Sequence, residues 1–285
     1  MIDLMNVPHL IIISLIGMTG LVSGQYDKAD LASDEQHFSW PEGKRFAISL
    51  TFDDARTSQI DLGIPLLDAH KIKATFYISP YGLEKRIEGW RAAALNGHEI
   101  GNHSMSHPCT GNYAFSRQNA LENYTLEQMA GELDRANEYI QRVLNIKSKA
   151  FAYPCGQTFV GYGNNTQSYV PLVADRFTTG RKWLNEAAND PLFCDMSQLL
   201  ARESDQKTFD DLLVLIEQAR SEGRWLILAG HEMADGGLQT TYLKTLQQLC
   251  QYANDQKNEL WMDTVSTIAD YILSHRKNPE YEPSY

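Results

Sequence analysis

The segment KRFAISLTFDDA, residues 44–55, is a largely apolar run that ends in two adjacent aspartates. A short run of this kind predicts a strand buried on both faces, as in a parallel sheet. A buried carboxylate costs free energy unless it is paired or bound to a metal, so Asp53 and Asp54 require an explanation. Two explanations are open at this point: the pair begins a helix as N-cap and neighbour, or it ligates an ion.

Strand and helix patterns alternate through the rest of the chain. Further strands are expected at 73–79, 98–104, 148–156, 224–232 and 259–264, and helices at 58–71, 87–97, 125–145, 208–223, 241–255 and 265–276. Thr125, followed three residues later by Gln128, predicts a capping box at the start of the clearest helix. This alternation indicates a parallel sheet, and so many units without a linker predict a single α/β domain built as a (β/α) barrel.

The net charge of −11 argues against a phosphate-binding surface, since Lys and Arg form no long basic run in these 285 residues. We therefore expect no nucleic-acid partner, and no pattern in the sequence indicates a stable protein partner.

The N-terminal region predicts export. Residues 10–24 are apolar, short for a bilayer span, and end in small residues with Val22 and Gly24 placed as a signal peptidase requires. The start is atypical because it carries Asp3 and no Lys or Arg, and a membrane anchor is the alternative. We expect a signal peptide at 1–24, a lead-in at 25–43, a catalytic domain at 44–276, a tail at 277–285, and a secreted or periplasmic mature protein.

The four cysteines lie far apart, at Cys109, Cys155, Cys194 and Cys250. In an exported protein they allow three full disulfide pairings, between which the sequence does not choose. Buried free thiols are the alternative.

Polar residues follow the predicted strands at their carboxyl ends: Asp53 and Asp54, His103 and His107, Cys155, and His231. In a parallel barrel these ends share one face, where active sites are built. In HSMSH, residues 103–107, the i, i+4 spacing would place both imidazoles on one side of a helical turn. A solvated turn explains HSMSH alone equally well, but two histidines and one aspartate on one face leave coordination positions open, as a catalytic zinc requires.

The segments TFDD, HSMSHP, YPCG and LAGH, in this order, resemble the motifs of the polysaccharide deacetylase family, also called the NodB-homology domain or carbohydrate esterase family 4. The resemblance covers roughly residues 44–275. It implies a distorted (β/α) barrel and the metal-dependent removal of acetyl groups from an acetylated oligo- or polysaccharide.

Carried over by motif position, the resemblance makes Asp53 the general base and His231 the general acid. It implies that Asp54, His103 and His107 hold one divalent metal ion, for which we expect zinc. The backbone N–H of Cys155 would face the oxyanion.

Two positions depart from the family pattern. Ala152 stands where the third motif normally carries the arginine that holds the base, and Arg181 is our candidate to replace it, with an ordinary surface arginine as the alternative. The last motif also lacks its usual leucine two residues before the histidine, so Leu228 or Leu226 would wall the acetyl pocket.

Three aromatic residues remain ambiguous in the sequence. Trp183 corresponds either to a site-lining tryptophan of the fourth motif or to a core residue. Tyr162 and Trp90 could stack on sugar rings or simply pack.

Two other functions stay open. A catalytically silent sugar-binding relative is favoured by the lost arginine and disfavoured by the retained aspartates and histidines. A deacylase of a small non-sugar amide would fit the same barrel and metal, but the signal peptide disfavours it.

Overall fold

The computed structural model describes residues 38–276. The predicted signal peptide, most of the lead-in and the predicted tail at 277–285 lie outside the described residues. Among the described helices, none combines the length and apolar character needed to cross a bilayer.

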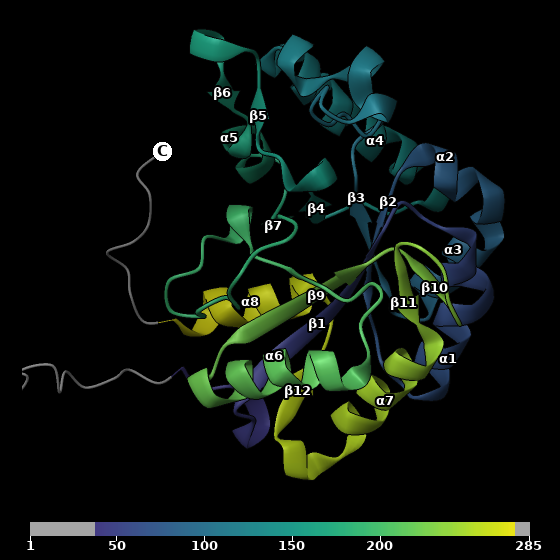
Figure 1. Ribbon diagram of the computed structural model, residues 1–285, viewed down its shortest axis with the longest axis vertical. Helices are drawn as coiled ribbons and strands as arrows, with labels where there is room; N and C mark the ends of the chain where they lie inside the picture. The colour runs from purple at the N-terminus through teal and green to yellow at the C-terminus, as the bar shows by residue number, and fades with distance from the viewer. Residues whose placement is uncertain (1–37, 277–285) are drawn as a thin grey trace, which may run out of the picture. The chain divides into compact units, whose positions relative to one another are not determined.

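Within residues 38–276, eight parallel strands form one sheet (Figure 1). The strand order is β7-β4-β3-β2-β1-β9-β8, with β12 pairing the first half of β1. The strands are β1 (Phe46–Asp53), β2 (Thr75–Ile78), β3 (Glu99–Asn102), β4 (Ala150–Ala152), β7 (Thr179–Arg181), β8 (Arg202–Glu203), β9 (Trp225–Gly230) and β12 (Leu260–Met262).

The two ends of this sheet approach each other. Leu199, just before β8, forms a parallel bridge with Arg181 of β7, and its N–H and C=O bond Gly180 and Lys182. Residues 199–203 therefore run between β7 and β9 and close the sheet into the predicted barrel, irregularly at this seam.

Helices follow the strands and cover the sheet: α1 (Ile64–Ala69), α2 (Pro80–Leu83), α3 (Ile87–Leu95), α4 (Leu126–Leu144), α5 (Val170–Ala174), α6 (Phe209–Glu222), α7 (Leu243–Asn254) and α8 (Val265–His275). Two small additions lie outside the main sheet, the antiparallel pair β5 (Phe159–Val160) and β6 (Gln167–Ser168) and the parallel pair β10 (Glu232–Ala234) and β11 (Thr240–Tyr242).

The alternation of side chains along β1 explains why Asp53 lies where it does. Phe46, Ile48, Leu50 and Phe52 pack into the main core with residues of α1, α3, α6 and α7. The alternate residues are small or polar, and among them Ala47 packs with residues of α8. Since side chains alternate between the faces of a strand, Asp53 projects to the second face, away from the main core.

Most predicted elements are present, including the capping box in which Thr125 and Gln128 bond each other's backbone N–H. The predicted helix at 58–71 begins as a wider turn at Gln59–Gly63 before α1. One detail was wrong, since residues 103–107 form no helical turn. Residues 157–169, for which no element was predicted, contain the β5–β6 hairpin.

Candidate active site

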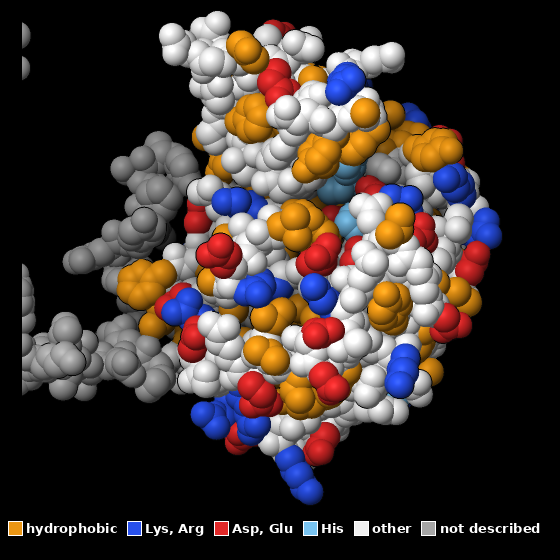
Figure 2. Space-filling view, in the orientation of Figure 1, with side chains coloured by type: hydrophobic (Ala, Val, Ile, Leu, Met, Phe, Trp, Pro, Cys, Tyr) orange, Lys and Arg blue, Asp and Glu red, His pale blue; other side chains and the backbone are white. Residues whose placement is uncertain are grey.

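A cavity of about 690 Å³ opens at the carboxyl ends of the strands. Histidine side chains are visible in the hollow that faces the viewer in Figure 2. The cavity brings together most of the residues that the sequence singled out. They come from five strand ends: Asp53 and Asp54 at the end of β1, His103 and His107 after β3, Cys155 after β4, Trp183 after β7 and His231 after β9.

The Asp53–Asp54 turn is fixed by its neighbours. Asp54 has a left-handed backbone with φ of 72°. The buried Gln59 donates from its amide to the carbonyls of Asp53 and His231, at 2.7 and 2.8 Å, and so ties the end of β1 to the end of β9. Gly82 of α2 lies so close that a Cβ there would come within 2.1 Å of the Asp54 carbonyl oxygen. Only glycine allows this approach.

The HSMSH segment is a loop supported by α4. Asn102 donates to the Leu133 carbonyl and to Asn137, and its own oxygen accepts the Ser104 N–H at 2.6 Å. Ser106 bonds the buried Glu132 through its N–H and its hydroxyl. These bonds hold Ser104 and His107 at positive φ, 62° and 54°, and it is this turn, not a helix, that brings the imidazoles together.

Asp54, His103 and His107 have the spacing of a metal site. Asp54 Oδ1 lies 3.6 Å from Nε2 of each histidine. A tetrahedral zinc ion with bonds of about 2.0–2.1 Å separates neighbouring donor atoms by about 3.3–3.4 Å. On the other side of the ring, His103 Nδ1 lies 2.9 Å from the Ala152 carbonyl, which fixes the ring so that Nε2 faces Asp54.

The protonation of these groups also suits a metal. Burial alone would raise the pKa of Asp54, but the nearby histidines and Arg56 lower it to about 2. Burial and the neighbouring His103 lower the pKa of His107 to about 4, against the opposing charges of the two aspartates. At neutral pH, Asp54 is therefore a carboxylate and His107 is a neutral imidazole whose nitrogen is free to ligate. Together with His103, this set of donors fits one divalent ion.

Arg181 of β7 contacts Asp53 of β1, although three strands lie between β7 and β1 in the sheet. Its Nη2 donates to Asp53 Oδ1, and both side chains are buried, Arg181 completely. Arg181 is the register partner of Ala152 across the β4–β7 pair. Side chains paired in this way point to the same face, so β7 supplies a guanidinium beside the position where the family motif would place one on β4.

His231 is paired with a carboxylate that the sequence analysis did not identify. Its Nδ1 lies 2.6 Å from Asp205 Oδ2, and its backbone N–H donates to Asp205 Oδ1. Burial would lower the pKa of His231, but the hydrogen bond to Asp205 and the charges of Asp53 and Asp54 raise it above its ordinary value. Gly230 makes the arrangement feasible, because a Cβ there would lie 2.7 Å from Asp205 Oδ1 and 2.2 Å from Thr241 Oγ1.

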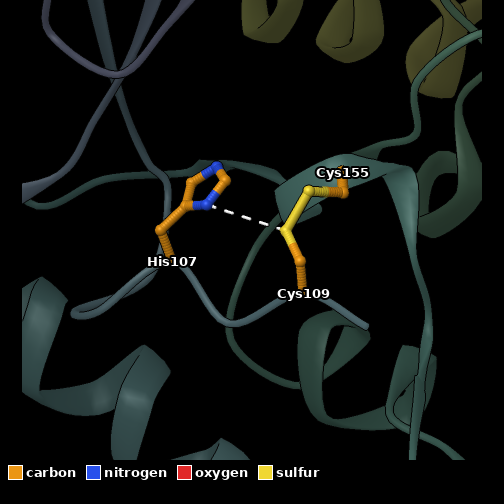
Figure 3. Close-up of side chains that lie close together, drawn as sticks. All are labelled: His107, Cys109 and Cys155. Carbon is orange, nitrogen blue, oxygen red and sulfur yellow. Dashed lines mark hydrogen bonds between the residues drawn. A yellow bond between two sulfur atoms is a disulfide. The ribbon is translucent and has the colours of Figure 1, made fainter. Parts of the chain in front are cut away.

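Cys155 presents its backbone N–H at the cavity. The residue has φ of 54° inside the short turn Pro154–Gly156, and among the described residues its N–H has no hydrogen-bond acceptor. An unpaired N–H at a cavity is suited to a developing negative charge on a ligand. The Cys155 side chain forms a disulfide with Cys109, two residues beyond His107 (Figure 3).

Comparisons with known proteins agree with this geometry. Residues 41–170 match the family model described as polysaccharide deacetylase. This similarity to the family covers slightly less than half of the chain. The matched segment contains Asp53, Asp54, His103, His107 and Cys155, and ends before Arg181, Asp205 and His231.

Among curated proteins, the chain is 32% identical to the uncharacterized protein YlxY of Bacillus subtilis over 93 residues, 33% of this chain and 26% of that protein. It is 29% identical to a peptidoglycan-N-acetylglucosamine deacetylase of Bacillus cereus over 140 residues, 46% of this chain and 47% of that protein. The alignments thus span less than half of the length of either relative.

Solved structures extend the similarity of fold. A putative polysaccharide deacetylase from Mycobacterium smegmatis superposes with a TM-score of 0.62 at 17% identity, covering 85% of this chain and 95% of that one. A protein described as a CE4 family pseudoenzyme from Bacillus anthracis superposes with a TM-score of 0.51 at 15% identity, covering 82% and 68%. At such identities the likeness shows the fold alone.

The structure places the remaining candidate residues as follows. Trp183 lines the cavity and meets the His231 ring edge-on at 4.9 Å between centroids. Leu228 and Leu226 are buried in the main core and are not among the cavity-lining residues. Trp90 is fully buried, packing on Phe76, and Tyr162 is exposed away from the cavity.

Asp205 and several cavity-lining residues carry no recognisable signal in the sequence. Asp205 follows the two-residue strand β8, too short to leave a periodic signal. Tyr81, Lys85, Tyr113 and Phe115 also line the cavity, from segments without a recognisable motif. For the disulfide, the sequence offers one hint. The tripeptide His-Pro-Cys at 107–109 places Cys109 close to the predicted ligand His107, and therefore close to the site where Cys155 was expected.

Proposed function

We propose that this chain is a metal-dependent carbohydrate deacetylase that hydrolyses N-acetyl or O-acetyl groups of an oligo- or polysaccharide. The observation that carries the proposal is the 3.6 Å spacing of Asp54 from both histidines beside a second, separately held carboxylate, Asp53. Bound by Asp54, His103 and His107, a zinc or similar ion would activate water and polarise the acetyl carbonyl.

Asp53 accepts the proton of the attacking water. One carboxylate oxygen receives the Arg181 hydrogen bond, which leaves the other, Oδ2, to face the site, where it lies 3.9 Å from His103 Nε2. Arg181 thereby orients the base and leaves Oδ2 free to accept the proton. The Cys155 N–H then stabilises the negative charge that develops on the acetyl oxygen.

His231 donates a proton to the departing amine or alcohol. Asp205 bonds Nδ1, so the ring presents Nε2 to the cavity and remains protonated to higher pH than an ordinary histidine. An acid of this kind matters most for an amide, because an amine leaves poorly unless it is protonated.

The rim of the cavity suits a sugar chain. Tyr113 and Phe115 stack on each other at 5.4 Å with planes 10° apart, and both remain exposed at the rim. Tyr81, 76% exposed, stands among the lining residues with Lys85 over its ring at 4.1 Å. Exposed aromatic faces of this kind provide apolar surface for sugar rings, which supports a glycan over a small amide.

We also propose that the protein acts outside the cytoplasm. The Cys109–Cys155 disulfide supports this, because disulfides persist in oxidising compartments.

The test of the proposed function compares two substrates. Metal-replete protein is incubated with N-acetylglucosamine oligomers and with acetylated xylan, and released acetate is measured. Release from the first indicates amide hydrolysis, and release from the second indicates ester hydrolysis. If neither releases acetate although the oligomers bind, the silent sugar-binding alternative replaces this proposal.

Arg181→Ala is expected to lower kcat on the order of 10²-fold with little change in KM, because Asp53 loses the group that orients it. The fold should also lose about 3–5 kcal/mol, since a buried carboxylate is left without its partner. Steady-state kinetics and urea unfolding measure the two effects.

Arg176→Ala is the matched control, since Arg176 pairs with Asp134 at the surface. Because Ala152 faces Arg181 in register, Ala152→Arg combined with Arg181→Ala should recover part of the lost kcat. Unchanged kcat in Arg181→Ala would contradict the assigned role.

Asp205→Asn is expected to move the alkaline limb of the pH–kcat profile to lower pH by about 1–2 units. Asp205 raises the pKa of His231; without its charge, His231 loses its proton at lower pH and the acid form disappears sooner. Asparagine keeps an oxygen for the His231 and Thr241 bonds, so the fold should be preserved. Glu203→Gln is the control, and an unmoved limb in Asp205→Asn would rule out the pairing as the source of the acid form.

A further inference from the structure

The Cys109–Cys155 disulfide joins the two loops that supply opposite parts of the candidate site. Cys109 lies two residues after His107, and Cys155 itself carries the free backbone N–H. The bond spans 46 residues of sequence, which include all of α4. Figure 3 shows the His107 ring beside the two bonded sulfurs.

The His107 ring contacts this disulfide on the side away from Asp54. Its Nε2 faces Asp54, and its Nδ1 lies 3.7 Å from Cys109 Sγ. A metal-binding histidine ordinarily bonds a carboxylate, carbonyl or water through its second nitrogen, as His103 does with Ala152. Among the described residues, Nδ1 of His107 has Cys109 Sγ as its partner.

The packing around His107 is also looser than around His103. The His107 side chain is 29% exposed, against 2% for His103. His107 and Cys155 both have φ of 54°, a region that a residue with a side chain leaves unless its surroundings hold it. A covalent link between their loops supplies such a constraint.

The sulfurs are not metal ligands in this state. Ligand atoms of His107, Cys109 and Cys155 lie within 4.8 Å of one another, as in a metal site. A bound metal needs thiolates, however, and here each sulfur is bonded to the other. The disulfide therefore acts on the metal site through His107.

We propose that the Cys109–Cys155 disulfide is a redox-sensitive positioning element of the metal site, whose reduction weakens metal binding by Asp54, His103 and His107. The proposal rests on the metal site of the proposed function.

A reductant can reach the bond, since Cys155 lines the cavity whereas Cys109 is fully buried. A water-soluble phosphine attacks Cys155 Sγ, the S–S bond breaks, and Cys109 leaves as a thiolate. Water then releases the Cys155 thiol and the phosphine oxide, so that one phosphine and one water give two thiols and one phosphine oxide.

The test measures zinc affinity of the full chain, oxidised and phosphine-reduced, after the reagent is removed, by competition with a chromophoric chelator. Reduction is expected to weaken zinc binding about 10–100-fold, as the loss of a ligand's supporting partner does. Reoxidation should restore the affinity. The double variant Cys109→Ser, Cys155→Ser should match the reduced protein, and circular dichroism checks that both remain folded.

The free cysteines provide the matched control. Cys194 and Cys250 lie outside the cavity lining, so Cys194→Ser, Cys250→Ser should keep both the affinity and its sensitivity to reduction. Folded, reduced protein that binds zinc as tightly as the oxidised protein would overturn the proposal. So would a thiolate-to-cobalt absorption band in the reduced protein loaded with cobalt(II), because the sulfurs would then be ligands themselves.

Acetate release separates this inference from the proposed function. Zinc binding that depends on the disulfide in a protein that releases no acetate would leave the inference standing and refute the proposed function. If the protein releases acetate, and reduction changes neither this release nor the zinc affinity, the proposed function stands and this inference is refuted.

Discussion

Asp53→Asn is expected to lower kcat by 10²- to 10⁴-fold, roughly the contribution of a positioned general base, while the protein keeps its metal. Asparagine cannot accept the proton of the attacking water. Its amide oxygen can still accept the Arg181 hydrogen bond, so the buried guanidinium keeps a partner and the fold should survive. Acetate release and metal content, measured on the same preparation, check both parts.

The control for this variant is Asp210→Asn, which changes an exposed carboxylate in the first turn of α6. It should leave kcat and metal content unaltered. Loss of metal in Asp53→Asn would show that Asp53 is a ligand and would exchange the roles of the two aspartates. Full activity would remove Asp53 from the mechanism.

Asp54→Ala is expected to abolish metal binding and with it acetate release. Removing the carboxylate leaves two imidazoles, which hold a divalent ion far more weakly than three donors do. Because the metal supplies several kcal/mol of transition-state stabilisation, the rate should fall on the order of 10³-fold or more.

His103→Ala and His107→Ala should behave like Asp54→Ala, since each removes a donor 3.6 Å from Asp54 Oδ1. His231→Ala should retain the metal and lose turnover, and this difference distinguishes the general acid from the metal ligands. His275→Ala, at an exposed position of α8, is the control for a change of histidine. Metal retained stoichiometrically by His107→Ala would break the ligand assignment.

The sequence predicted the barrel and most of the site because both depend on local patterns. The apolar run of β1 and the capping box of α4 fix their elements without reference to distant residues. Once the strands are parallel, their carboxyl ends share a face, so residues such as Asp54 and His103 are brought together whatever the exact packing.

The features that the sequence left open depend on contacts between segments far apart. Arg181 reaches Asp53 because β7 pairs with β4 in one particular register, and one strand's residues do not reveal its partner's register. Asp205 follows a strand of two residues, and its role appears only beside His231. None of the three full pairings forms: Cys109 and Cys155 bond because their loops meet at the cavity, whereas Cys194 and Cys250 remain free.

The HSMSH turn failed as a helix prediction for a related reason. The i, i+4 spacing is typical of helices, but Asn102 and Glu132 offer the loop hydrogen bonds that replace a helical turn. The imidazoles still meet, with ring centroids 4.8 Å apart, so the predicted chemistry did not depend on the predicted backbone.

The most direct test of the central claim is a zinc titration of metal-free oxidised protein, with bound zinc and acetate release from N-acetylglucosamine oligomers or acetylated xylan measured at each step. Acetate release should rise in proportion to bound zinc and level off at one ion per chain, and Asp53→Asn should bind the same zinc without the activity. Full release from chelated protein, or none from either substrate at one zinc per chain, would contradict the account.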